Sequence, residues 1–154
     1  MRDLGELKVR MKGSRTALSP ADELLIRDFE KRFRVELPED YQTFLKEIPG
    51  GHPQLSVIRV AGAPWEINRF YPLTRGESPT TDLVSAMQEW SEVLGRGYVP
   101  FANDGGGNQF VLAVGQKPAP VYIVIHDEDF RQVKLANSFA EFVDALEEVP
   151  DDEL

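Results

Sequence analysis

Apolar residues recur at helical spacing in four parts of the chain, each bounded by residues that start or stop a helix. The first helix is expected to begin near Ser19, a capping residue followed by Pro20 at the first helical position. The last begins with a predicted capping box, in which the Ser138 side chain and the Glu141 side chain satisfy each other's free backbone donors. The pattern predicts helices at about residues 19–33, 38–48, 81–94 and 138–149.

Between the second and third helices, and again after the third, the pattern changes to short runs rich in β-branched and aromatic residues. These runs predict strands at residues 55–60, 65–71, 98–102, 109–114, 121–125 and 132–136. The fifth run is almost entirely β-branched, which is typical of a strand buried on both faces in the centre of a sheet. Leu7, Val9 and Met11 alternate with basic residues, which predicts an edge strand near the N-terminus.

The order of these elements indicates the fold class. Helices come first, then a run of strands interrupted by one helix, then a terminal helix, with no regular βαβ alternation. We therefore expect a single α+β domain with one largely antiparallel, twisted sheet of about five or six strands and about four helices packed on it. A length of 154 residues suits one such domain. We expect an N-terminal segment at 1–18, the domain at 19–150 and an acidic tail at 151–154.

The charge of the chain narrows the range of partners. The sequence has 26 acidic and 17 basic residues, a net charge of −9, and residues 137–154 contain seven acids and no base. Because Lys and Arg supply most of the affinity for nucleic acid, direct binding of DNA or RNA is disfavoured. A basic protein partner is compatible with this charge, and so is a role in solubility alone. The chain has no long apolar run and no apolar signal segment, so we expect a cytoplasmic protein that binds no membrane.

The sequence contains few side chains that could carry out catalysis. Cysteine is absent, which removes disulfides, thiol nucleophiles and thiolate metal sites, and the imidazoles are limited to His52 and His126. The sequence lacks the serine-hydrolase elbow, the zinc-binding His-Glu-x-x-His pair and the dinucleotide-binding glycine motif. We therefore expect no catalysis, no metal and no cofactor. The remaining enzymatic alternative is a small carboxylate-dependent enzyme, in which Asp104, Asp127 or His126 would line one pocket.

The most unusual local feature is the run of residues Asp104, Gly105, Gly106, Gly107 and Asn108. Three glycines allow backbone dihedrals that are closed to other residues, and they could expose amides to an anion. A phosphate-binding loop needs a following lysine and a helix, whereas a predicted strand follows here. We expect a structural loop that is also presented to a partner.

A second polar cluster consists of His126, Asp127, Glu128 and Asp129. Consecutive residues in an extended segment point in alternating directions, so these side chains do not converge on one metal ion unless the loop curls. We interpret them as a solvated hairpin tip. His52 is expected in a loop after the second helix.

The two tryptophans, Trp65 and Trp90, are expected to be core anchors. Trp65 belongs to a predicted hairpin, and its surroundings are also a candidate contact surface.

Three blocks of the sequence together resemble the SUKH superfamily and its Smi/Knr-like domains. The blocks are LPEDYQTFLKEIPGG, FANDGGGNQFVLAV and SFAEFVDALE, and the resemblance spans roughly residues 19–149. It implies an α+β fold without enzymatic activity. In bacterial members it implies an immunity protein that binds and neutralises a polymorphic or contact-dependent toxin, frequently a nuclease.

The hypothesis from sequence is therefore a non-enzymatic binding module, a monomer or weak homodimer, whose partner is a toxin domain with a basic surface. The alternative is a regulatory or scaffolding protein related to the fungal cell-wall synthesis regulators. The candidate partner-binding residues are His52, Trp65, Asp104, Gly105, Gly106, Gly107, Asn108, Asp127, Glu128 and Asp129.

Overall fold

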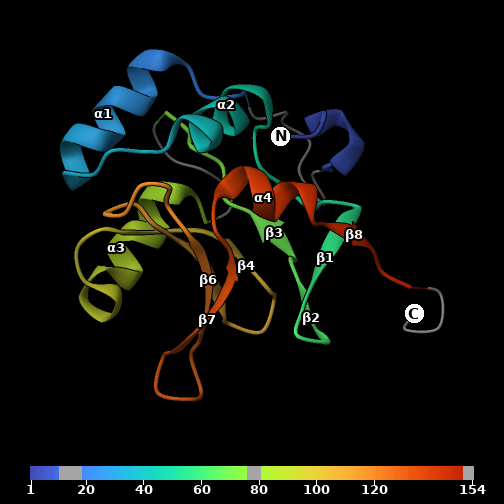
Figure 1. Cartoon of the computed structure of the whole chain (residues 1–154). Coiled ribbons are helices and arrows are strands. Elements are labelled where there is room, and N and C mark those ends of the chain that lie inside the picture. The colour runs from blue at the N-terminus through green and yellow to red at the C-terminus, as the bar shows by residue number, and fades with distance from the viewer. Residues whose placement is uncertain (11–18, 76–80, 151–154) are drawn as a thin grey trace.

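Four helices form where the sequence predicts them, although the first begins later and the last ends earlier than expected. The computed structural model describes residues 1–10, 19–75 and 81–150 (Figure 1). The predicted capping box of the last helix forms in part, because the Ser138 side chain accepts from the Glu141 N–H over 3.1 Å. The first helix is capped by Asp22 and not by Ser19, because the Asp22 carboxylate accepts from the Leu25 N–H. The helices are α1 (Glu23–Phe33), α2 (Glu39–Glu47), α3 (Leu83–Leu94) and α4 (Phe139–Asp144).

The strands form two antiparallel sheets, which confirms the α+β class and divides the one predicted sheet in two. The larger sheet has five strands in the order β3-β4-β5-β6-β7, and the smaller has three in the order β2-β1-β8. The strand predicted at the sheet centre, β6, lies second from an edge, and the central strand is β5. The bounds are β1 (Leu55–Val60), β2 (Ala63–Glu66), β3 (Arg69–Phe70), β4 (Tyr98–Asn103), β5 (Gln109–Ala113), β6 (Val121–Ile125), β7 (Arg131–Ala136) and β8 (Glu147–Glu148).

The two sheets separate between two consecutive residues of the strand predicted at 65–71. The Ile67 N–H donates to the carbonyl of Ser56 in β1, whereas the Asn68 N–H donates to the carbonyl of Asn103 at the end of β4. The chain therefore changes hydrogen-bonding partner at this point. The predicted strand becomes β2 in one sheet and β3 in the other.

Two predictions at the ends of the chain are wrong. The predicted N-terminal edge strand is replaced by a 3-10 helix at Leu4–Leu7 and an isolated bridge between Arg10 and His52, and residues 11–18 lie outside the described part. The last helix ends at Asp144 and not near Val149, and Glu147–Glu148 pair with β1 as β8. The predicted acidic tail, 151–154, also lies outside the described residues.

Helices α2 and α4 pack against one face of the larger sheet through a cluster of aromatic rings. Phe101, on β4, has its ring centroid 5.4 Å from that of Phe139 and 5.5 Å from that of Phe142, both on α4. Edge-to-face contacts of this kind stabilise a core beyond the area they bury. The fully buried rings of this cluster are Tyr41, Phe44, Phe70, Phe101, Phe110, Phe139 and Phe142.

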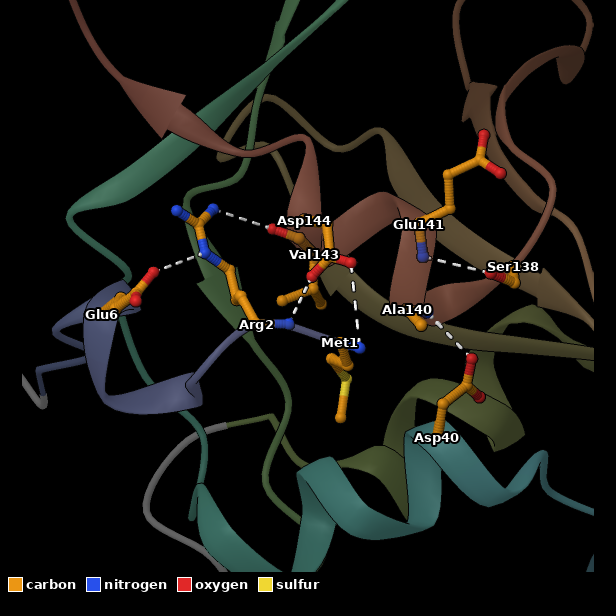
Figure 2. A network of polar contacts seen from close by, with 9 residues as sticks. All are labelled: Met1, Arg2, Glu6, Asp40, Ser138, Ala140, Glu141, Val143 and Asp144. Atoms are coloured by element: carbon orange, nitrogen blue, oxygen red, sulfur yellow. Dashed lines mark hydrogen bonds and ion pairs between the residues drawn. The ribbon is translucent and has the colours of Figure 1, made fainter.

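Helix α4 has only six residues, and its start is held by a side chain from α2 (Figure 2). The Asp40 carboxylate accepts from the Ala140 N–H over 2.9 Å, while Ser138 caps Glu141. Two of the free N–H groups at the start of the helix are therefore satisfied by side chains.

The other end of α4 is held by Arg2. Its guanidinium donates to the carbonyl of Val143 over 3.1 Å and also contacts the Glu6 carboxylate (Figure 2). It donates as well to the carbonyl of Leu146 over 2.8 Å. A cation at a helix C-terminus interacts favourably with the helix dipole and with the unpaired carbonyls. The N-terminal segment and α2 thus position this short helix on the sheet.

Candidate functional site

The loop between β4 and β5, residues 104–108, is closed by the carboxylate of Asp104. One carboxylate oxygen accepts from the Gly106 N–H over 2.8 Å and from the Asn108 N–H over 3.0 Å. The other accepts from the Asn108 side-chain amide over 2.7 Å. Asp104 therefore holds the shape of this glycine loop, as the sequence predicts for a structural loop.

Two of the three glycines are required by the backbone. Gly105 has a φ of +85° and Gly107 a φ of +100°, in the left-handed region that side chains rarely adopt. A Cβ at Gly107 would also lie 3.0 Å from His126 Cε1. Gly106 has neither restriction, since a Cβ there would only touch the Asp104 carboxylate at 3.5 Å.

His126 joins the glycine loop to the hairpin between β6 and β7. The Asn108 side-chain oxygen accepts from the His126 backbone N–H over 3.0 Å and lies 2.8 Å from His126 Nδ1. The Asn108 nitrogen is committed to the Asp104 carboxylate, so the orientation of the amide is determined by its partners. Nδ1 of His126 therefore carries the proton and donates to the amide oxygen. This contact brings two predicted clusters together.

The glycine loop is also held in place by the side chains of Tyr71, Asn103 and Gln109. The Tyr71 hydroxyl donates to the side-chain oxygen of Gln109 over 2.6 Å, and the Asn103 amide donates to the same hydroxyl over 3.3 Å. The Gln109 amide continues to the Gly107 carbonyl over 3.4 Å. Burial raises the pKa of Tyr71, so its hydroxyl keeps the proton that it donates.

His52 reaches the same network from the segment after α2. Its Nδ1 lies 2.7 Å from the carbonyl oxygen of Asn68, which can only accept, so Nδ1 is the protonated nitrogen. The Asn68 N–H in turn donates to the Asn103 carbonyl over 2.8 Å. His52 and the glycine loop border one cleft of about 240 Å³ where the two sheets meet. Its lining residues are His52, Pro53, Ser56, Glu66, Ile67, Asn68 and Asp104.

Trp65 lies outside this network. It is opposite Ile58 in the β1–β2 pair and packs, partly buried, against the main core. Its indole Nε1 is buried and has no hydrogen-bond partner. The structure therefore places Trp65 as the core anchor that the sequence also predicted.

Acidic side chains gather at the tip of the β6–β7 hairpin, as predicted. Asp127, Glu128 and Asp129 are all exposed there. Glu128 forms an ion pair with Arg131 at 3.2 Å, whereas neither aspartate has a basic partner in the described part of the chain. No group of three side chains that could hold a metal ion occurs among the described residues.

Four residues of the network were not predicted from the sequence: Asn68, Tyr71, Asn103 and Gln109. Asn103 and Gln109 flank the glycine run, and an amide beside such a run is a local signal that could have found them. Asn68 and Tyr71 lie more than thirty positions before the loop in the sequence, and no local pattern marks them. Their part in the site depends on the pairing of β3 with β4.

A larger groove, of about 660 Å³, lies between α1, α2 and the connection from β5 to β6. Its lining holds three acids and three bases, most of them paired: Glu23 contacts both Arg27 and Lys46, and Lys117 lies 3.7 Å from Glu36. These pairs leave the groove without an excess of either charge. It is a weaker candidate for a charged partner than the hairpin tip.

A family model, the SMI1 / KNR4 family (SUKH-1), matches residues 20–145. The chain belongs to this family. The match covers α1 through α4, including the glycine loop and the hairpin tip, and it confirms the resemblance seen in the sequence blocks. A comparison with curated proteins found no matching relative. Within the described ranges, every helix is too short or too polar to cross a lipid bilayer.

Proposed function

We propose that this SUKH-family chain is a protein-binding module that acts in the cytoplasm as an immunity protein against a bacterial toxin. The observation that carries the proposal is the joined surface of the glycine loop and the hairpin tip. There, a network of hydrogen bonds holds the backbone around exposed, unpaired aspartates. Membership of the SUKH family supports a module of this type.

Rigidity and charge are the two properties that such a surface needs. Asp104 and Asn108 order the loop before any partner arrives, so little conformational entropy remains to be lost on binding. Asp127 and Asp129 extend into solvent on the tip, which lies far from α1 and α2 (Figure 1). Together with the net charge of −9, they would attract a basic surface and accelerate association.

The proposal includes no catalytic step. The carboxylate and imidazole side chains of this region hold the loop in place. Asp104 accepts three hydrogen bonds, and both histidines donate from Nδ1 to neighbouring oxygens. A toxin that acts on nucleic acid needs a basic groove, and an acidic hairpin tip could block such a groove directly. We expect the unbound chain to be a monomer or a weak homodimer.

The test uses the toxin domain that an immunity protein of this kind is expected to have in the adjacent reading frame. Purified chain is titrated with this domain by biolayer interferometry at low and high salt, and toxin activity is assayed with and without the chain. We expect binding and inhibition, with an association rate that falls as salt rises. Absence of binding and of inhibition would refute the immunity role.

A pair of double variants tests the surface. Asp127→Lys with Asp129→Lys reverses the tip, and Asp28→Lys with Glu47→Lys makes the same charge change on exposed, unpaired acids of α1 and α2. We expect the tip variant to lower the association rate about tenfold or more, and the control variant to lower it by a smaller, long-range effect. Equal effects would show that the tip is not at the interface.

A further inference from the structure

The larger sheet has a second face that is only partly covered. Its first face packs against α2 and α4, whereas the second carries a small separate cluster of apolar side chains beside α3. In this cluster Leu94, Val111 and Val124 are buried. Trp90, Tyr98 and Tyr122 pack against them and stay partly exposed. The part of this sheet face that carries these three rings is therefore apolar and partly exposed to solvent.

Aromatic rings dominate this open area. The Trp90 and Phe130 rings meet edge to face with centroids 6.1 Å apart, which links α3 to the hairpin tip. Phe130 is 42% exposed and Val93, three positions after Trp90 on α3, is 44% exposed. Large side chains of this kind are usually covered, and two of the four that the described chain exposes occur here. We call Trp90, Val93, Tyr98, Tyr122 and Phe130 the aromatic face.

The backbone at Phe130 is held in an unfavourable conformation. Its φ is +57°, and bulky side chains rarely occupy this region because Cβ approaches the backbone. Asp129 before it has a φ of +55°. Strained residues persist where the surroundings impose them, and they cluster at functional positions. Here the strain directs an apolar ring next to Trp90 at the protein surface.

The charges around the aromatic face indicate the kind of partner. On α3 and at the β6–β7 hairpin tip, the exposed acids that have no basic partner in the described chain are Glu89, Glu92, Asp127 and Asp129. On the segment after α3 and on β7, the exposed bases without an acidic partner among the described residues are Arg96 and Lys134, because Arg131 is paired with Glu128. The local excess is acidic. A second copy of the chain would bring the same excess and a net charge of −9, so self-association is opposed.

We propose that the aromatic face is the anchor site for a basic protein partner, whose apolar or arginine side chains pack on Trp90, Tyr122 and Phe130. Arginine suits such rings because its guanidinium stacks on their faces. Tryptophan and tyrosine in partly desolvated positions carry a large share of binding energy in known interfaces. This inference rests on the proposed function and names the surface that would hold the toxin after the acidic tip has attracted it.

Two variants of the aromatic face test this with the toxin domain. Val93→Lys places a cation on the face, and Leu24→Lys is the matched control, an equal charge change at a residue of α1 that is 61% exposed. Phe130→Gly removes the ring and relieves the left-handed backbone, so the protein stays folded. We expect Val93→Lys and Phe130→Gly to weaken binding about tenfold or more, mainly through faster dissociation, and Leu24→Lys to change it less than about twofold.

A second measurement tests the face without the toxin. The ¹⁵N-labelled chain is titrated with a capped hexapeptide of alternating arginine and leucine, and with the same peptide carrying glutamate for arginine. We expect the basic peptide to shift the Trp90 indole N–H and the backbone amides of Tyr122 and Phe130, and the acidic peptide to leave them unchanged. Absence of shifts, or shifts confined to the glycine loop, would overturn the inference.

The outcomes separate this inference from the proposed function. Toxin binding that Val93→Lys and Phe130→Gly leave intact would overturn the aromatic anchor while the immunity role stands. No toxin binding, with peptide shifts at Trp90 and Phe130, would refute the immunity role and support the face as a site for a basic segment. A dimer in sedimentation analysis that Val93→Lys dissociates would overturn the inference in favour of a second copy.

Discussion

Asp40, in the first turn of α2, accepts a hydrogen bond from the backbone N–H of Ala140, in the first turn of α4, over 2.9 Å. The second oxygen of this carboxylate accepts from the Tyr41 N–H over 2.8 Å. One side chain therefore satisfies a free N–H in each of two helices that are 100 residues apart in the sequence. This contact fixes α4 on the sheet together with the helix's own cap, Ser138 (Figure 2).

Replacing Asp40 should destabilise the fold more than replacing an ordinary surface acid. We expect Asp40→Ala to lower the free energy of unfolding by about 1–2 kcal/mol, because two helix N–H groups lose their acceptor. The matched control is Asp28→Ala, at an exposed carboxylate of α1, which should change it by less than about 0.5 kcal/mol. Urea denaturation followed by circular dichroism measures both. Equal effects would show that the contact contributes nothing to stability.

Gly106 and Gly107 of the glycine loop should differ in how far replacement by alanine destabilises the protein. Gly107→Ala places a Cβ at a φ of +100° and 3.0 Å from the His126 ring, so we expect a loss of about 1–3 kcal/mol and a displaced histidine. Gly106→Ala meets only the Asp104 carboxylate at 3.5 Å and should cost less than about 0.5 kcal/mol. Denaturation and the His126 ring resonances in NMR spectra report the two effects. A tolerant position 107 would contradict the described packing.

The two buried tyrosines of the core should change stability in opposite directions. The Tyr41 hydroxyl is buried without a hydrogen-bond partner, so Tyr41→Phe is expected to be neutral or to stabilise by up to about 1 kcal/mol. The Tyr71 hydroxyl donates to Gln109, so Tyr71→Phe leaves a buried acceptor unpaired and should cost about 1–2 kcal/mol. Thermal and urea unfolding of both variants provide the comparison. A destabilised Tyr41→Phe would indicate that its hydroxyl has a partner, such as an internal water.

The same two tyrosines predict a loss of stability in alkaline solution. Burial raises the pKa of Tyr41 and of Tyr71 in the folded chain, while an unfolded tyrosine ionises near its ordinary pKa of about 10. Above that pH the unfolded state releases protons that the folded state keeps, so stability is complete below about pH 10 and declines as pH rises further. Urea unfolding between about pH 8 and pH 11 should show this decline.

A variant series assigns that decline to the tyrosines. Tyr41→Phe combined with Tyr71→Phe should reduce the slope of stability against pH above about pH 10. An unchanged slope in the double variant would mean that other groups cause the alkaline loss.

Most secondary structure could be predicted from the sequence because its signals are local. Pro38, with the acids that follow it, begins α2, and Ser138 begins α4, since caps act within one helical turn. The run Val121–Ile125 forms β6 with the predicted bounds, since β-branched residues favour strands buried on both faces. The glycine loop and the exposed hairpin tip were likewise predicted, because glycine and charged residues determine turns over a few positions.

The errors occur where a distant segment decides the structure. The end of α4 depends on Arg2, which binds the carbonyls of its last turn, and on the pairing of Glu147–Glu148 with β1. The division into two sheets depends on Asn68, whose N–H pairs with Asn103 instead of continuing along β1. The spacing of apolar residues cannot reveal such partners, because it shows which faces of an element are apolar and not which segment packs on them.

The sequence by itself determined the α+β class, the positions of the helices and most strands, the closed glycine loop and the acidic hairpin tip, since each follows from the conformational preferences of neighbouring residues. Only the tertiary structure decided that Asn108 binds His126, that Tyr71 and Asn68 support the loop, and that Trp90 meets Phe130 on an open face of the sheet. The physical reason is that hydrogen bonds and ring contacts act over a few ångströms in space, whatever the separation of the residues along the chain.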